Sequence, residues 1–379
     1  MSAQSFTEGL EGVVATQSGV CYVDGQAGRL VYRGYDISDL ATSSTFEEVT
    51  YLLWFGQLPT MSQLATLTTD LANSRALPSE IVDLLHRLPR DANNMDVLRT
   101  AVSALGLYDP EANDPSPAAN ARKAVRLTSQ IATLVTAYYR IQQGQEPIAP
   151  DPSLTHAASF LHMLLGKAPS LEMARILDIA LILHADHELN ASTFAARVTA
   201  ATLSDFYSTA TSAIGTLKGP LHGGANEAVM KMLLEVDQPE RIEAYVSGEF
   251  AAKRRIPGFG HRVYKTWDPR ALILRDLMCD LELRVEQPKW CTLARLVTEA
   301  VWQGKRLYPN VDFYSAPLYF TLGIPIELYT PVFAVSRMSG WAAHVLEQYS
   351  NNRLIRPRAE YTGGMDSEYV PIDQRAAAG

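Results

Sequence analysis

Three turns rich in glycine or proline each carry one side chain that could act as a general acid, a general base or a hydrogen-bond donor. In the first turn, residues 217–224, His222 is followed by Gly223 and Gly224, and a helical pattern starts at Ala225. Glycine is often found where a ligand must come close to the backbone, so the glycine pair favours a functional histidine. The alternative is an ordinary surface or capping residue.

The second turn runs from Ile256 to Asp268 and carries His261. Its Gly258-x-Gly260 pair lacks the third glycine of a dinucleotide-binding fingerprint. Because no predicted strand precedes the pair either, a Rossmann site is not expected. What remains is a second histidine on a glycine-flanked turn.

Arg270 lies just inside the next predicted helix, for which Asp268 is the expected N-cap and Pro269 the first residue. A cation in the first turn of a helix is disfavoured by a few tenths of a kcal/mol up to about 1 kcal/mol. A solvated arginine is one interpretation. The other is that Arg270 binds a carboxylate that also meets the free N–H groups of the helix start.

The third turn, Tyr308 to Ser315, carries Asp312 among aromatic residues. An aspartate at this place is commonly a helix N-cap, and the alternative is a carboxylate base. Elsewhere, His184 and His187 are spaced for one helix face, so a metal pair is conceivable, but no third ligand stands nearby. Arg337 lies in an apolar helix pattern and needs an anionic partner, because an unpaired buried charge is costly.

Together these side chains suit carbon-acid chemistry on a polycarboxylate without a metal or a nucleotide cofactor. An aspartate with an unperturbed pKa of about 3.9 is too weak a base to deprotonate a methyl group beside a thioester unaided. A neutral hydrogen-bond donor must therefore stabilise the developing enolate.

The whole chain has the composition of an ordinary globular protein, with 379 residues, 47% hydrophobic residues and a formal net charge of -8. This length favours two domains, and the acidic balance argues against a nucleic-acid surface. Three cysteines at spacings of neither a disulfide framework nor a zinc ribbon indicate a reducing compartment. We expect a cytoplasmic protein, because the first residues do not read as a secretory signal and no run is long enough for a membrane span.

The periodicity predicts a nearly all-α architecture. A small hairpin is expected around Asp24-Gly25, with strands at 20–23 and 29–32. Helical patterns are predicted at 46–55, 62–73, 79–88 with Ser79 as N-cap, 96–107, 118–142, 153–165, 170–187, 191–202, 206–217, 225–235, 239–255, 269–286, 288–303 and 331–349.

These motifs occur in the order found in the citrate synthase family, which the sequence resembles over nearly its whole length. The matching segments are Tyr32 to Ile37, Met95 to Arg99, His184 to Glu188, the His222 and His261 turns, Asn310 to Ser315, Ser336 to His344, and Arg356 to Gly363. The resemblance implies an acyltransferase that condenses acetyl-CoA with oxaloacetate and hydrolyses citryl-CoA to citrate and CoA.

The resemblance also implies a role for each matching residue. His222 would hydrogen-bond the enol of acetyl-CoA, Asp312 would remove the methyl proton, and His261 would polarise the oxaloacetate carbonyl. Oxaloacetate would be held by His187, Arg270, Arg337 and Arg356, with Arg356 supplied by the neighbouring subunit of a homodimer, which could assemble further. CoA, a substrate and not a bound cofactor, would be met by Ile256, Gly258, Phe259, Gly260, Lys265 and Asn310.

The implied fold is an all-α, two-domain citrate synthase-like fold. A large domain, residues 1–223 and 324–379, would hold the dimer interface and the oxaloacetate site. A small domain, residues 224–323, would hold the CoA site and close on oxaloacetate about a hinge at His222. Such closure protects a thioester from idle hydrolysis.

Two alternatives stay open. Ser315-Ala316 replaces the Ser-Gly of many citrate synthases and is shared with 2-methylcitrate synthases, which use propionyl-CoA. One methylene is worth only about 1 to 3 kcal/mol of discrimination, so both acyl groups could be accepted. From another class, a non-catalytic helical metal-binding or scaffold protein could use His184, His187 and Glu188.

Overall fold

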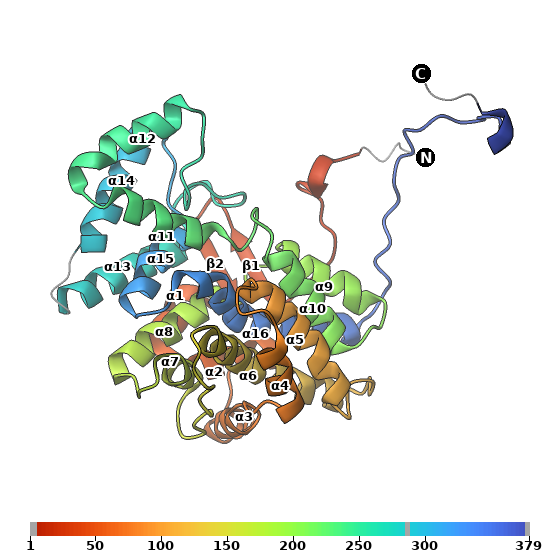
Figure 1. Ribbon diagram of the computed structural model, residues 1–379, viewed down its shortest axis with the longest axis horizontal. Coiled ribbons are helices and arrows are strands. Elements are labelled where there is room, and N and C mark those ends of the chain that lie inside the picture. Colours follow the sequence, from red (N-terminus) through yellow and green to blue (C-terminus); the bar gives the residue numbers. More distant parts are fainter. Residues whose placement is uncertain (1–5, 285–288, 376–379) are drawn as a thin grey trace.

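The computed structural model describes residues 6–284 and 289–375, and it is built almost entirely from helices (Figure 1). The first ten helices are α1 Ile37–Ser43, α2 Phe46–Phe55, α3 Met61–Asn73, α4 Ser79–Arg87, α5 Asn94–Tyr108, α6 Pro117–Gln142, α7 His156–Leu165, α8 Leu171–His184, α9 Ala191–Ala201 and α10 Phe206–Leu217. The others are α11 Ala225–Val236, α12 Ile242–Ala251, α13 Pro269–Arg284, α14 Lys289–Lys305, α15 Val311–Thr321 and α16 Tyr329–Ser350. The prediction of an all-α fold with a small N-terminal hairpin is confirmed. In the part of the chain described here, no helix combines the length and the apolar character needed to cross a membrane.

The N-terminal hairpin is a three-stranded antiparallel sheet, of which the sequence predicts two strands. Strand β1 Cys21–Asp24 pairs with β2 Arg29–Tyr32, and β2 pairs with the two-residue β3 Tyr35–Asp36. Asp36 then caps α1 by accepting a hydrogen bond from the Ser38 N–H. Both β3 and α1 escaped prediction because they are too short to show a period.

Several helices end or begin at other residues than the sequence predicts. The pattern over 170–187 ends as a helix at His184, because the loop that follows contains Glu188 at a positive φ of 53°. The predicted cap Ser79 is the first helical residue, preceded by Pro78. The pattern over 239–255 divides into a 3₁₀ turn, Pro239–Arg241, and the helix α12.

Helix α16 runs through the centre of the molecule and is buried along nearly its whole length (Figure 1). It contacts α2, α6, α8, α9 and α10. Gly340 permits its closest approach, because a Cβ at this position would lie 2.1 Å from the Ala185 carbonyl oxygen. The C-terminal half of the chain therefore supplies the axis on which the earlier helices pack.

Helices α11 to α15 gather at one side of the molecule, at the upper left of Figure 1. Within this group α15 contacts α11, α13 and α14, and α12 contacts α14. The group meets the remaining helices through α1, α8 and α16. In the sequence, the turn with His222 directly precedes α11, and the loop with His261 directly precedes α13.

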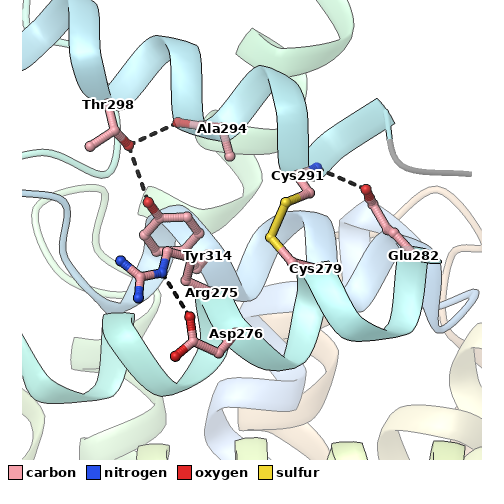
Figure 2. The surroundings of a disulfide bond; sticks show 8 residues. All are labelled: Arg275, Asp276, Cys279, Glu282, Cys291, Ala294, Thr298 and Tyr314. Atoms are coloured by element: carbon pink, nitrogen blue, oxygen red, sulfur yellow. Dashed lines mark hydrogen bonds and ion pairs between the residues drawn. A yellow bond between two sulfur atoms is a disulfide. The ribbon is translucent and has the colours of Figure 1, made fainter. Parts of the chain in front are cut away.

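A disulfide joins Cys279 of α13 to Cys291 of α14, contrary to the expectation that the cysteines form no disulfide framework (Figure 2). The sequence spacing of the cysteines could not reveal this pair, because the two cysteines come close only when α13 and α14 pack side by side. Glu282, one turn after Cys279, accepts a hydrogen bond from the Cys291 N–H at 2.8 Å and so caps α14. The pairing removes the cysteine argument for a reducing compartment.

Reduction of this disulfide is expected to destabilise the protein by about 3 kcal/mol, since it releases a closed loop spanning a sequence separation of 12 residues. Denaturant unfolding with and without reductant measures the change. A Cys279→Ser variant is the control, because its midpoint should not respond to reductant. An equal midpoint for the wild type in both conditions would contradict the prediction.

Candidate active site

His222 lies on the turn between α10 and α11 and is held by Ser192 at the start of α9. Its Nε2 is 2.8 Å from the Ser192 hydroxyl and 3.3 Å from the Ser192 N–H. The backbone N–H can only donate, so Nε2 is an acceptor and the ring proton belongs on Nδ1. The sequence predicted the histidine, but nothing in it pointed to Ser192.

Burial, followed by the charge of Arg337, lowers the pKa of His222 to about 4. The imidazole is therefore neutral at physiological pH and offers an N–H group without a positive charge. A neutral donor of this kind is what stabilisation of an enolate requires.

His261, on the loop before α13, has the opposite tautomer. Its Nδ1 accepts hydrogen bonds from the N–H groups of Val263 at 3.0 Å and Tyr264 at 3.1 Å. The ring proton therefore belongs on Nε2, where it can be donated to a carbonyl oxygen. Burial and the nearby Arg270 lower the pKa of His261 to about 4.

His187 joins this group from the loop after α8. Its ring centre lies 5.2 Å from that of His261, and its Nε2 lies 3.2 Å from the hydroxyl of Tyr264. Burial and the charge of Arg270 hold the pKa of His187 well below its usual range. Two predicted site residues, far apart in the sequence, are therefore brought into contact.

Asp312 lies in the first turn of α15, where Asn310 is the cap: its side chain accepts the hydrogen bond of the Asp312 N–H at 3.0 Å. The alternative of Asp312 as an N-cap is therefore wrong, and its carboxylate is free for another task. Its Oδ1 is buried without a hydrogen-bond partner among the described residues. Burial raises the pKa of Asp312 to about 7, although Arg270 and Arg337 act in the opposite direction.

Arg270 is buried, so the alternative of a solvated arginine is also wrong. Its Nε and Nη2 donate to the two oxygens of Asp268 at 3.0 Å and 2.7 Å. Asp268 also accepts from the N–H of Val311, one residue before Asp312. Asp268 thus neutralises the cation at the helix start and ties α13 to α15, a role that sequence analysis missed because it predicted only a cap.

Arg337 of α16 is 1% exposed and has no carboxylate within 4.0 Å among the described residues. Its Nε donates to the His184 carbonyl at 2.7 Å, and its guanidinium lies 4.7 Å from the ring centre of Phe333. The ring of Phe333 in turn lies 6.4 Å from that of His222. The described part of the protein therefore does not itself supply the anionic partner that the sequence predicted for Arg337.

Arg356 is not brought to this group within one chain. It is exposed and lies beyond the end of α16, in a segment without helix or strand. Figure 1 shows this segment leaving the helical body on the same side as the N-terminal residues.

The glycine loop and the Asn310 turn form one structure beside α15. The Asn310 N–H donates to the Gly258 carbonyl at 2.9 Å, and its side-chain amide donates to the Gly260 carbonyl at 3.0 Å. Gly258 has φ 77°, and a Cβ there would lie 2.7 Å from Val229 and 2.8 Å from the Phe313 side chain. Ile256 is buried, the ring of Phe259 lies 4.6 Å from that of Phe313 at a tilt of 59°, and Lys265 is exposed.

His184, the other histidine of the predicted pair, is the last residue of α8. Its ring is fully buried, with Nδ1 2.8 Å from the Ala180 carbonyl oxygen, and burial lowers its pKa to about 3. Among residues 6–284 and 289–375, no three His, Cys, Asp or Glu side chains are placed to hold a metal ion.

The fold and the site define a helical enzyme with two neutral histidine donors, a buried carboxylate oxygen without a partner among the described residues, and two buried arginines. Comparison with known families agrees. The family described as "Citrate synthase, C-terminal domain" matches residues 9–358. The chain belongs to the citrate synthase family.

Three relatives show the extent of the likeness. Citrate synthase 2 of Bacillus subtilis is 51% identical over 371 residues, covering 98% of this chain and 99% of the relative. The citrate synthase of Haloferax volcanii is 49% identical, covering 97% and 98%. A solved structure of the Thermoplasma acidophilum citrate synthase is a ternary complex with carboxymethyl coenzyme A and oxaloacetate. Its match to this chain has a TM-score of 0.92 at 34% identity, covering 98% of this chain and 100% of that one.

Other relatives carry a second name. A Bacillus subtilis protein named citrate/2-methylcitrate synthase is 43% identical over 361 residues, covering 95% of this chain and 97% of the relative. The family assignment therefore leaves the acyl group to be decided by experiment.

Proposed function

We propose that this enzyme condenses acetyl-CoA with oxaloacetate and hydrolyses citryl-CoA to citrate and CoA, a reaction of the tricarboxylic acid cycle. The observation that carries the proposal is that one buried carboxylate oxygen of Asp312 has no hydrogen-bond partner among the described residues, while His222 and His261 are neutral imidazoles of opposite tautomer. The bound ligands named for the Thermoplasma relative, oxaloacetate and a coenzyme A analogue, support the same substrates.

In this proposal Asp312 takes the methyl proton and His222 donates its Nδ1–H to the developing enolate oxygen. The Nε2–H of His261 polarises the keto group that the enolate attacks. General base action contributes about 10²–10⁴ in rate and one well-placed donor roughly 3 to 4 kcal/mol, so the two must act together.

Oxaloacetate would be held by His187, Arg270 and Arg337. Arg337 contributes the guanidinium that lacks a carboxylate, and a bound dicarboxylate would supply one. Arg270 is already neutralised by Asp268, so its contact with substrate would add to an existing ion pair.

CoA would lie against the loop formed by Ile256, Gly258, Phe259 and Gly260, with Asn310 bracing that loop and the exposed Lys265 near the phosphates. A Cβ at Gly260 would meet no atom within 4 Å, so a ligand can approach the backbone at this glycine. Helices α11 to α15, within residues 224–323, would move as the small domain, and residues 1–223 and 324–379 would form the large one. The proposed hinge is the turn with His222.

A homodimer would complete the site. Two large apolar side chains are exposed, Leu107 of α5 at 83% and Leu203, in the turn after α9, at 70%. A groove of about 450 Å³ between α5 and α10 lies beside Leu107. A second copy would cover this face and could bring its Arg356 to the site. A cytoplasmic location stays a prediction of the sequence.

Thiol release from acetyl-CoA in the presence of oxaloacetate tests the proposal. We expect release with both substrates present, and a higher kcat/KM for acetyl-CoA than for propionyl-CoA. The rival function, 2-methylcitrate synthesis, is favoured by the fully buried Ala316 in place of glycine. A preference for propionyl-CoA would establish that rival, and no release with either acyl-CoA would refute both.

A further inference from the structure

A chain of buried polar side chains connects the loop after α8 to the end of α16. The His344 Nε2 lies 3.3 Å from the carboxylate of Asp186, and its Nδ1 lies 2.9 Å from Arg197 Nη1. The same Nη1 donates to Glu347 at 2.6 Å. His344 and Asp186 are both fully buried, yet neither belongs to the group proposed to touch substrate.

The direction of each hydrogen bond in this chain is fixed by chemistry. A guanidinium can only donate, so the Nδ1 of His344 accepts from Arg197. The ring proton of His344 therefore lies on Nε2 and is donated to Asp186. His344 thus acts as a directional link between an ion pair at the end of α16 and a buried carboxylate.

Asp186 holds the backbone of the loop that carries His187. Its Oδ2 accepts from the N–H of Glu188 at 3.1 Å. Glu188 has a φ of 53°, which costs free energy for a residue other than glycine and persists only where the surroundings hold it. The Tyr32 hydroxyl also accepts from the N–H of Asp186 and donates to its carbonyl.

Helix α16 contacts the start of this loop through two hydrogen bonds. One turn before the close contact of Gly340, Arg337 donates to the carbonyl of His184. One turn after Gly340, His344 donates to Asp186. Arg337, Gly340 and His344 share one face of α16, and all three contact the loop that carries His187. If the contact of His344 were lost and the loop shifted, His187 would therefore move relative to Arg337.

We propose that His344, fixed by Arg197, is a positioning residue that acts through Asp186 to hold His187 and Arg337 in register for a dicarboxylate. The inference rests on the proposed function, because it assigns those two residues to oxaloacetate. It predicts an effect on substrate affinity that exceeds the effect on the maximal rate, since Asp312 and His222 lie outside the chain of contacts.

The test compares His344→Leu, His344→Asn and His344→Gln, with oxaloacetate affinity measured by titration calorimetry and kcat and KM by thiol release. A glutamine amide can donate to Asp186 and accept from Arg197, a shorter asparagine cannot span both, and leucine can do neither. We expect Kd and KM for oxaloacetate to rise about tenfold to a hundredfold in the leucine variant, with kcat at saturation within about threefold of wild type. Glutamine should restore Kd to within about threefold.

His156→Leu is the matched control for loss of a buried histidine. His156 starts α7, its ring stacks on Phe46, and its ring nitrogens have no hydrogen-bond partner among the described residues. This variant should bind oxaloacetate as the wild type does. If His344→Leu does not fold, the asparagine and glutamine variants decide, with asparagine expected to bind at least tenfold more weakly than glutamine.

Wild-type affinity in His344→Leu, an equal loss in His156→Leu, or no difference between glutamine and asparagine would overturn the inference while wild-type turnover still stands. A wild-type protein that neither binds oxaloacetate nor releases thiol would instead refute the proposed function, and the inference with it.

Discussion

Asp312→Asn is expected to lower kcat by about 10²–10⁴ while oxaloacetate affinity stays close to that of the wild type. The substitution keeps the shape of the side chain and removes the proton acceptor. Its neighbours need no rearrangement, because Asn310 caps α15 and the buried Oδ1 of Asp312 has no partner among the described residues. Thiol release should show the lower kcat, and calorimetry should show an oxaloacetate affinity close to that of the wild type. A kcat near that of the wild type would exclude Asp312 as the base.

The same substitution is expected to stabilise the protein above pH 7. The pKa of Asp312 is raised to about 7 in the folded protein, so the native state binds more protons than the unfolded chain between about pH 4 and pH 7. Stability therefore falls as pH rises through this window, and the ionised carboxylate costs about 4 kcal/mol above it. Asparagine removes this cost. Denaturant unfolding of both proteins at pH 5 and pH 8 should show a gain for the variant that is clearly larger at pH 8 than at pH 5.

His222→Ala is expected to lower kcat by about 10²–10³, through loss of the neutral N–H donor. The pKa of His222 near 4 means that the ring stays neutral across the physiological range, so the loss should be the same at pH 6.5 and pH 8.5. Oxaloacetate affinity should change little, because Arg337 and His187 are retained. Thiol release at both pH values measures the effect.

His222→Gln provides a control for the donor. Its amide can present an N–H group, although with different reach, and should recover part of the lost rate. An equal loss in the alanine and glutamine variants would indicate that the ring acts through packing on Phe333 and not through its proton.

Most helices were predictable because each carries several repeats of one pattern, but α15, which contains Pro317, was not predicted. The helices over 46–55 and 206–217 were predicted with their observed ends, since Thr45 and Asp205 cap them through local side-chain hydrogen bonds. The sequence carries little indication of features that depend on contacts between residues far apart in the chain or in different elements. The Cys279–Cys291 bond depends on two helices lying side by side, and β3 depends on pairing with β2.

The site was predictable in its chemical groups but not in its supports. His222, His261 and Asp312 stand on turns whose glycine, proline and asparagine residues are visible in the sequence. Their orientation depends on partners far away in the chain, such as Ser192 for His222. The sequence also could not show that Asp268 neutralises Arg270, because the same aspartate is a plausible cap.

The turn of the N-terminal hairpin illustrates how distance in the chain conceals a constraint. Gly25 does not have a positive φ, so its own backbone conformation would accept other residues. Yet a methyl group at this position would lie 2.2 Å from the Val263 carbonyl oxygen, and the Gly25 carbonyl accepts the N–H of Lys265 at 2.8 Å. A side chain at this position would clash with the backbone of the loop that carries His261. The residue type at this turn is thus limited by the backbone of Val263, which lies more than half the chain away in the sequence.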